Sequence, residues 1–110
     1  MTDQSLLETY VELHNSGVRT ADFEPMLGLF AENAEMAFHG LLVGPFRGID
    51  SIRNAFATHP PVDELVLPQT TINSLQSDYA WLSSPNTTAG RIKITAIGNH
   101  IRVLDVFVKK

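Results

Sequence analysis

The feature that most constrains the fold is a pair of alternating, largely apolar segments near the C-terminus, residues 91–97 and 100–109. Only Gly98-Asn99 separates them. Two such runs joined by two residues, with glycine first, are typical of a β-hairpin with a type II′ turn. The pattern therefore predicts two antiparallel strands in a sheet.

The register set by this turn assigns each hairpin residue to a face, because successive side chains of a strand point to opposite sides. It pairs Ile94 with Val103 and Ile92 with Asp105. One face then carries Ile92, Ile94, Ala96, Ile101, Val103, Asp105 and Phe107. The other carries Arg91, Lys93, Thr95, His100, Arg102, Leu104 and Val106. We expect the first face to be a core or pocket wall that holds one carboxylate; a slip of one residue would exchange the two faces.

Helical patterns come first and strand patterns follow. Apolar residues at spacings of three and four predict a helix that starts at a Thr2 or Asp3 cap and ends at Asn15-Ser16-Gly17. A short helix should follow Asp22, and a third should span 49–58. The expected strands are 34–39, 41–43, 65–67, 70–75 and 79–83, with a loop at 84–88. Three helices ahead of a mostly antiparallel sheet predict an α+β fold.

Composition narrows the class of protein. With 110 residues, of which 44% are hydrophobic and 18% charged, we expect a single globular domain over residues 1–110. The absence of cysteine excludes disulfides, a thiolate nucleophile and cysteine zinc sites. A net charge of −4 argues against nucleic acid or an anionic membrane as partner. Without a signal-like or membrane-spanning segment, we expect a cytoplasmic protein.

Three stretches carry a resemblance to a known family: Tyr10–Gly17, Met26–Ala34 and Gly48–Ile52. They resemble the SnoaL-like and ketosteroid-isomerase-like group of the nuclear transport factor 2-like superfamily. The resemblance implies a cystatin-like cone, in which a curved sheet wraps around a long helix and encloses an apolar pocket. Its members include isomerases, cyclases, hydrolases and proteins without known chemistry, so the fold does not fix the function.

The positions that carry chemistry in ketosteroid isomerases transfer only in part. Tyr10 falls where that family has its tyrosine donor, but the base falls near Phe38 and the carboxylic acid near Gly90. With these two carboxylates missing, the resemblance argues against steroid isomerisation by that mechanism. Asp105 falls at a cavity-lining position of the final strand, in agreement with the hairpin register.

The candidate catalytic residues are Asp105, Tyr10 and His14. Burial among apolar neighbours would raise the pKa of Asp105, as an acid or base near neutral pH requires; a rim carboxylate paired with an arginine is the alternative. Tyr10 is expected to donate a hydrogen bond into the pocket, or else to be a core tyrosine. His14, one turn later, is expected to relay protons, or else to stabilise the helix end. The expected pocket lining is Met36, Phe38, Phe56, Trp81, Ile92, Ile94, Val103 and Phe107.

These residues predict a pocket protein for a small apolar molecule. As an enzyme it would perform acid–base chemistry of the isomerase, cyclase or hydrolase type without a cofactor or metal, because no phosphate, dinucleotide or metal-binding motif occurs. One alternative is a binding module without catalysis. Another is an interaction module that uses the basic strand face. Apolar residues on both faces of the last strand predict a homodimer formed through the sheet.

Overall fold

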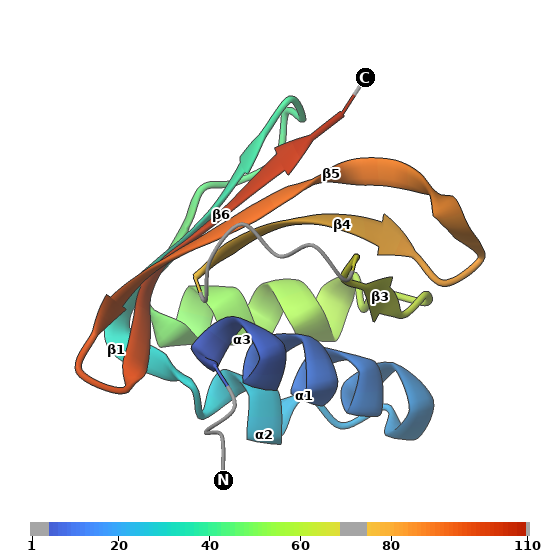
Figure 1. The fold of residues 1–110 in the computed structure, drawn as a ribbon. Coiled ribbons are helices and arrows are strands. Elements are labelled where there is room, and N and C mark those ends of the chain that lie inside the picture. The colour runs from blue at the N-terminus through green and yellow to red at the C-terminus, as the bar shows by residue number, and fades with distance from the viewer. Residues whose placement is uncertain (1–4, 69–74, 110) are drawn as a thin grey trace, which may run out of the picture.

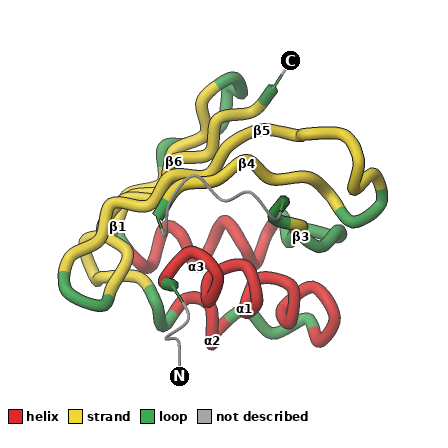
Figure 2. Tube along the Cα trace, in the orientation of Figure 1, coloured by secondary structure: helices red, strands yellow, loops and turns green. Residues whose placement is uncertain are grey.

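The computed structural model describes residues 5–68 and 75–109, and it has three helices packed against one face of a curved sheet (Figures 1 and 2). The helices are α1 (Leu6–Thr20), α2 (Glu24–Leu27) and α3 (Ile49–Thr58). The strands are β1 (Phe30–His39), β2 (Phe46–Arg47), β3 (Leu65–Val66), β4 (Gln76–Trp81), β5 (Ser84–Ile97) and β6 (His100–Val108). They form one sheet in the order β2-β1-β6-β5-β4-β3, antiparallel except between β1 and β6. The predicted α+β fold is confirmed.

Helix α1 begins and ends later than its sequence signals predict. Its N-cap is Ser5, which forms a capping box with Glu8; the predicted caps Thr2 and Asp3 lie outside the described residues. Gly17 does not end the helix. The Phe23 ring packs on it and leaves no room for a side chain, since a Cβ there would lie 2.3 Å from the ring. The glycine therefore serves helix packing, and α1 continues to Thr20.

The region between α2 and α3 differs from its prediction, whereas α3 itself matches its predicted bounds, 49–58. The expected strand at 41–43 is wrong. The strand that pairs back on β1 at the edge of the sheet is β2, whose Phe46 lies opposite Met36. Gly40 and Gly44 have positive φ angles, and the apolar residues between them stay in a bend, with Leu42 fully exposed.

The polar stretch 84–88 belongs to a strand, so the predicted loop is wrong. Ser84 pairs with Trp81 and Thr88 with Ala80 at the far end of β5, across two register shifts. Its side chains are exposed, so this extension needs no apolar alternation. Strand β4 starts at Gln76, earlier than predicted, and residues 69–74 of the predicted 70–75 strand lie outside the described part.

The β5–β6 hairpin has the predicted turn but not the predicted register. Ile97 pairs with His100 and Ala96 with Ile101, but Thr95 then pairs with Val103. One extra residue in β6 forms a β-bulge, which reverses the faces of every later β6 residue. The bulge lets both Ile101 and Leu104 lie fully buried against the helices. Val103, Asp105 and Phe107 therefore face outward, and the predicted face assignment for them is wrong.

The inner face of the sheet and the helices share one apolar core. Leu7 on α1, Ile52 on α3 and Leu104 on β6 are completely buried. Aromatic contacts join the layers, for example between Phe23 and Phe56, whose ring centroids are 5.3 Å apart. None of the described helices is long and apolar enough to cross a membrane.

Candidate functional site

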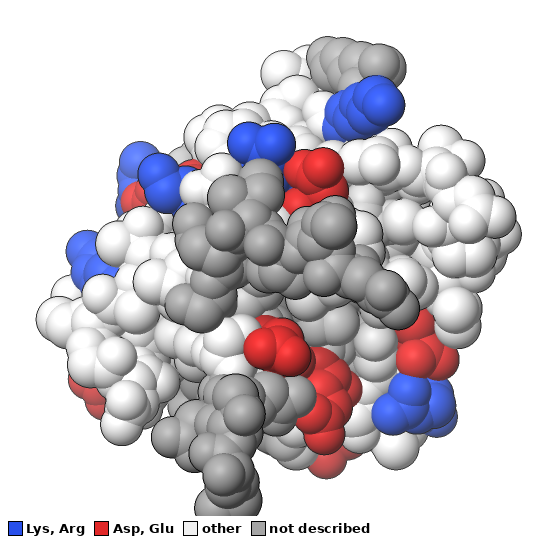
Figure 3. All heavy atoms as spheres, in the orientation of Figure 1, with Lys and Arg blue, Asp and Glu red and all other residues white. Residues whose placement is uncertain are grey.

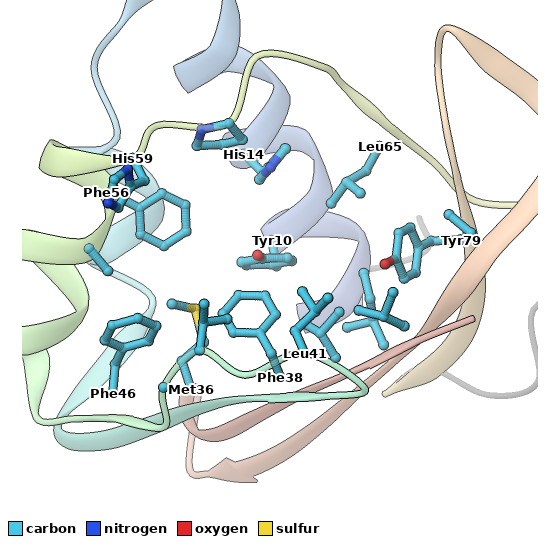
Figure 4. A pocket seen from close by; sticks show the side chains of 18 of the residues that line it. Tyr10, His14, Met36, Phe38, Leu41, Phe46, Phe56, His59, Leu65 and Tyr79 are labelled. Atoms are coloured by element: carbon cyan, nitrogen blue, oxygen red, sulfur yellow. The ribbon is translucent and has the colours of Figure 1, made fainter. Parts of the chain in front are cut away.

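A cavity of about 810 Å³ lies between the inner face of the sheet and helices α1 and α3 (Figure 4). Its size is within the range of small-molecule sites, roughly 300–1,000 Å³. The apolar side chains on its wall are Met36, Phe38, Leu41, Val43, Phe46, Ala55, Phe56, Pro61, Leu65, Trp81, Ala89, Ile92, Val106 and Val108. Trp81 is the only tryptophan of the chain, which makes it a natural fluorescent reporter of this space.

Most of the predicted lining residues lie on this wall. They are Met36, Phe38, Phe56, Trp81 and Ile92. Ile94 is buried in the core, 3% exposed, but does not line the cavity. Val103 and Phe107 lie on the outer face, so the prediction that they line the pocket, which depends on the unbulged register, is wrong. Val106 and Val108 take their places.

Two polar side chains of α1, Tyr10 and His14, face the cavity. They are one helical turn apart, with ring centroids separated by 6.1 Å. Figure 4 shows both in the cavity, with Tyr79 of β4 across from them and His59 at the end of α3. Among the described lining residues there is no Asp, Glu, Lys or Arg. The polar side chains of this wall are therefore those of Tyr, His, Asn and Thr residues, which can form hydrogen bonds with a ligand.

The Tyr10 hydroxyl is held in an apolar environment. The residue is 4% exposed, and its ring meets Phe30 edge-on at a centroid distance of 6.2 Å. Burial, and to a smaller extent the nearby Tyr79, raises the pKa of the Tyr10 hydroxyl well above its usual value. Within residues 5–68 and 75–109 the hydroxyl has no hydrogen-bond partner, so it is available to a ligand.

His14 is buried, and its ring is hydrogen-bonded to the side chain of its neighbour Asn15. Burial lowers the pKa of the His14 ring, against smaller opposing effects of the Asn15 hydrogen bond and of Glu64. The His14 Nδ1 lies 3.0 Å from the Asn15 Oδ1. The Asn15 amide also forms two hydrogen bonds with the backbone of Leu65 in β3, at 2.9 and 2.7 Å. Sequence reasoning treated Asn15 only as part of a helix end; its position beside His14 was the signal it missed.

Asp105 does not meet Tyr10 and His14. Its Oδ1 lies 2.8 Å from the Nε2 of His39 on the outer face of the sheet. The His39 ring stacks on Phe107, with centroids 4.4 Å apart. The side chains of Asp105 and His39 are 21% and 47% exposed. The bulge in β6 is the reason, because it turns Asp105 away from the cavity.

Solved structures of other proteins share this arrangement at low sequence identity. A protein from Sphaerobacter thermophilus is 19% identical, with 98% of this chain and 99% of that chain covered and a TM-score of 0.67. The Delta 5-3-ketosteroid isomerase from a Mycobacterium species is 16% identical, with 96% and 94% covered and a TM-score of 0.65. An NTF2-like protein from Anabaena variabilis is 16% identical, with 100% and 95% covered and a TM-score of 0.65.

The chain has the nuclear transport factor 2-like fold. No protein-family model matches the sequence, and no curated protein matches it. At these identities the likeness to solved structures concerns the fold alone, as the resemblance in the sequence implied.

The two positions at which the sequence resemblance implies carboxylates, Phe38 and Gly90, hold no carboxylate in this chain. Phe38 lines the cavity with an aromatic ring. Gly90 is buried, and a Cβ there would lie 2.1 Å from the Phe107 carbonyl oxygen. The backbone of β6 therefore leaves no room for a side chain at Gly90. Among the described residues no group of three His, Asp or Glu side chains could hold a metal ion.

Proposed function

We propose that the protein binds a small, uncharged, largely apolar molecule in the cavity between the sheet and the helices. The observation that carries this proposal is an apolar space of about 810 Å³ whose described lining holds no Asp, Glu, Lys or Arg. Burial of apolar ligand surface stabilises a complex by roughly 25 cal/mol per Å² before the costs of association. A charged ligand would lose its hydration without gaining a carboxylate, ammonium or guanidinium partner on the described wall.

The shared fold supports the same class of ligand. The Mycobacterium enzyme is named for a ketosteroid, which is an apolar ring molecule with a polar oxygen. The aromatic wall here and the two hydroxyls of Tyr10 and Tyr79 fit a molecule of that general kind, apolar along its length and polar at one point.

Trp81 fluorescence tests the proposal directly. We expect saturable quenching or enhancement on titration with 4-cyclohexylcyclohexanone, and much weaker binding of 4-cyclohexylcyclohexanecarboxylate. Ala55→Phe should weaken binding, because Ala55 lines the cavity on α3. Ala57→Phe is the matched control, since Ala57 is exposed on the same helix. Equal binding by the two variants, or preference for the carboxylate, would contradict the proposal.

We propose acid–base chemistry of the isomerase or cyclase type, without a cofactor, as a second candidate function. It is supported by the presence of two titratable groups, Tyr10 and His14, in one apolar cavity, with burial favouring the neutral, basic form of His14. Tyr10 would donate a hydrogen bond to a carbonyl oxygen while His14 accepts a proton from the adjacent carbon. Asp105 has no direct part, because it lies on the other face of the sheet.

Deuterium exchange distinguishes this chemistry from binding alone. In D2O, the wild type should accelerate exchange of the protons beside the carbonyl of 4-cyclohexylcyclohexanone, followed by NMR. Tyr10→Phe and His14→Phe should each slow that exchange. A rate equal to that in buffer, with the ketone bound, would leave binding as the function.

We propose that homodimers form through the outer face of the sheet, where Phe107 is 40% exposed and Val103, on the same face of β6, is partly exposed. Sedimentation velocity should show a dimer that Phe107→Arg disrupts; a monomer at all concentrations would contradict it.

The alternative of an interaction module that binds a partner through a basic strand face has less support. Arg91 is paired with Asp78, and Figure 3 shows basic and acidic side chains lying together at several places on that view.

A further inference from the structure

We propose that the cavity selects ligands that carry a hydroxyl group, because His14 presents to the cavity a ring nitrogen that can only accept a hydrogen bond. The inference rests on the proposed binding function and adds the chemistry of the ligand's polar group. It depends on three residues in contact, His14, Asn15 and Leu65.

The two hydrogen bonds of Asn15 with Leu65 determine which way the Asn15 amide faces. Its Nδ2 donates to the Leu65 carbonyl oxygen at 2.9 Å, and its Oδ1 accepts from the Leu65 backbone N–H at 2.7 Å. A reversed amide would place two donors together and two acceptors together, so only this orientation is compatible with β3.

The orientation of the amide in turn determines where the neutral His14 ring carries its proton. The Nδ1 of His14 lies 3.0 Å from the Oδ1 of Asn15, which has no proton to give. The Nδ1 must therefore be the donor, and the neutral ring then has no proton on Nε2. Within the described part of the chain, Nε2 has no hydrogen-bond partner. It is the nitrogen left for a ligand in the cavity shown in Figure 4.

An unprotonated Nε2 distinguishes between ligand groups that otherwise look alike. A hydroxyl can donate to Nε2, whereas a ketone oxygen at the same place brings two sets of lone pairs together. The Tyr10 hydroxyl, one turn away, can donate or accept and so serves either ligand. The discrimination between a hydroxyl and a ketone therefore depends on His14. Asn15 is the positioning residue that determines which ring nitrogen of His14 carries the proton.

The experiment compares two ligands that differ only at the polar atom, trans-4-cyclohexylcyclohexanol and 4-cyclohexylcyclohexanone, by Trp81 fluorescence at pH 7.5. We expect the alcohol to bind about tenfold more tightly. His14→Phe should bring the two affinities together. His100→Phe is the control, because His100 lies exposed beside the hairpin turn, and it should keep the full preference.

Asn15→Asp gives a result that a merely structural role of Asn15 would not produce. A carboxylate beside Nδ1 stabilises the protonated ring, in which Nε2 also carries a proton and becomes a donor. The preference for the alcohol should then disappear, because a hydroxyl oxygen and a ketone oxygen can both accept a hydrogen bond from Nε2–H. Long-range ¹H–¹⁵N spectra of the ring report the same change, from one protonated nitrogen to two.

The wild-type spectrum also tests the inference without any variant, since it shows whether Nδ1 or Nε2 carries the proton. A proton on Nε2, or affinities for alcohol and ketone within twofold of each other, would overturn the inference and leave the proposed binding function intact. Failure of both ligands to bind would overturn the binding function itself, and the inference with it.

Discussion

The two faces of the β5–β6 ladder have opposite chemistry, although their residues alternate along the same two strands. Toward the helices lie Ile92, Leu104 and Val106, which belong to the core or the cavity wall. Toward the outside lie Arg91, in an ion pair with Asp78, and Asp105, which is hydrogen-bonded to His39. The charged groups of this ladder are thus kept on the surface where water already stabilises them.

This separation shows where binding energy is available. Ion pairs between exposed side chains contribute about 0–1 kcal/mol, so the outer face adds little to stability or to recognition of a small molecule. The inner face excludes water from an apolar space, where both burial and single hydrogen bonds carry more weight. Four substitutions or conditions test this contrast.

The largest effect is expected from a charge on the inner face. Leu104→Asp places a carboxylate at a completely buried position between the strand partners Met36 and Ile94, and it should lower the free energy of unfolding by about 4 kcal/mol or more. Urea denaturation measures the loss. The control Thr95→Asp puts the same group on the outer face and should change stability by about 0.5 kcal/mol or less. Similar losses in both variants would contradict the separation of faces.

A methyl group at Gly90 should lower the free energy of unfolding nearly as much as Leu104→Asp does. Gly90→Ala brings a Cβ to 2.1 Å from the Phe107 carbonyl oxygen, so the two strands must move apart, and we expect a loss of about 3 kcal/mol. Gly28→Ala is the matched control, because a Cβ there would meet its nearest atom at 3.4 Å. Unchanged thermal unfolding of Gly90→Ala would show that the ladder is looser than described.

Acid should lower the free energy of unfolding, because His14 on the inner side of the molecule becomes protonated. Burial lowers the pKa of His14 below its usual 6.5, so the unfolded chain binds a proton before the folded chain does. Stability should therefore be complete above about pH 6.5 and fall as the pH drops toward the folded pKa, by about 1.4 kcal/mol for each unit of pKa difference. The ionisable groups around the ring are Tyr10, His59, Tyr79, and Glu64 with its partner Arg19.

The measurement is the difference in unfolding free energy between pH 7.5 and pH 5, by urea denaturation. His14→Phe should reduce the pH dependence, and His39→Phe on the outer face should leave most of it. A pH dependence that persists in His14→Phe would assign it to other groups.

The smallest effect is expected from the outer carboxylate. Asp105→Asn removes the half-exposed pair with His39 and should lower stability by about 1 kcal/mol or less. Ligand affinity measured by Trp81 fluorescence should not change, because Asp105 is outside the cavity. A tenfold loss of affinity would show that the outer face communicates with the cavity.

The sequence predicts the fold well where local signals agree with packing. Helix α3 has its predicted bounds because Gly48 precedes it and proline residues follow. Gly17 is a stop signal on its own, but the ring of Phe23 needs the space above it, and no local pattern reveals that contact. At Gly17 it is the contact with Phe23, and not the local sequence, that explains the glycine.

The candidate site could be predicted from the sequence on the helix but not on strand β6. Tyr10 and His14 follow from helical spacing, which does not depend on register. Strand β6 is apolar at both odd and even positions, so its inner face depends on one bulged residue, and the turn sequence does not encode it. The partnership of Asn15 with Leu65 joins positions far apart in the chain and has no local signal.

The parallel pairing of β1 with β6 has a consequence for how the molecule is made. In the sheet, β6 lies between β1 and β5, yet it leaves the ribosome after the other five described strands. Until then β1 has an open edge on that side, and the apolar side chains that will line the cavity have no completed wall. Such long-range pairings form late. The nascent chain therefore reaches its native state only after synthesis of this strand, and in that interval a chaperone would have most to protect.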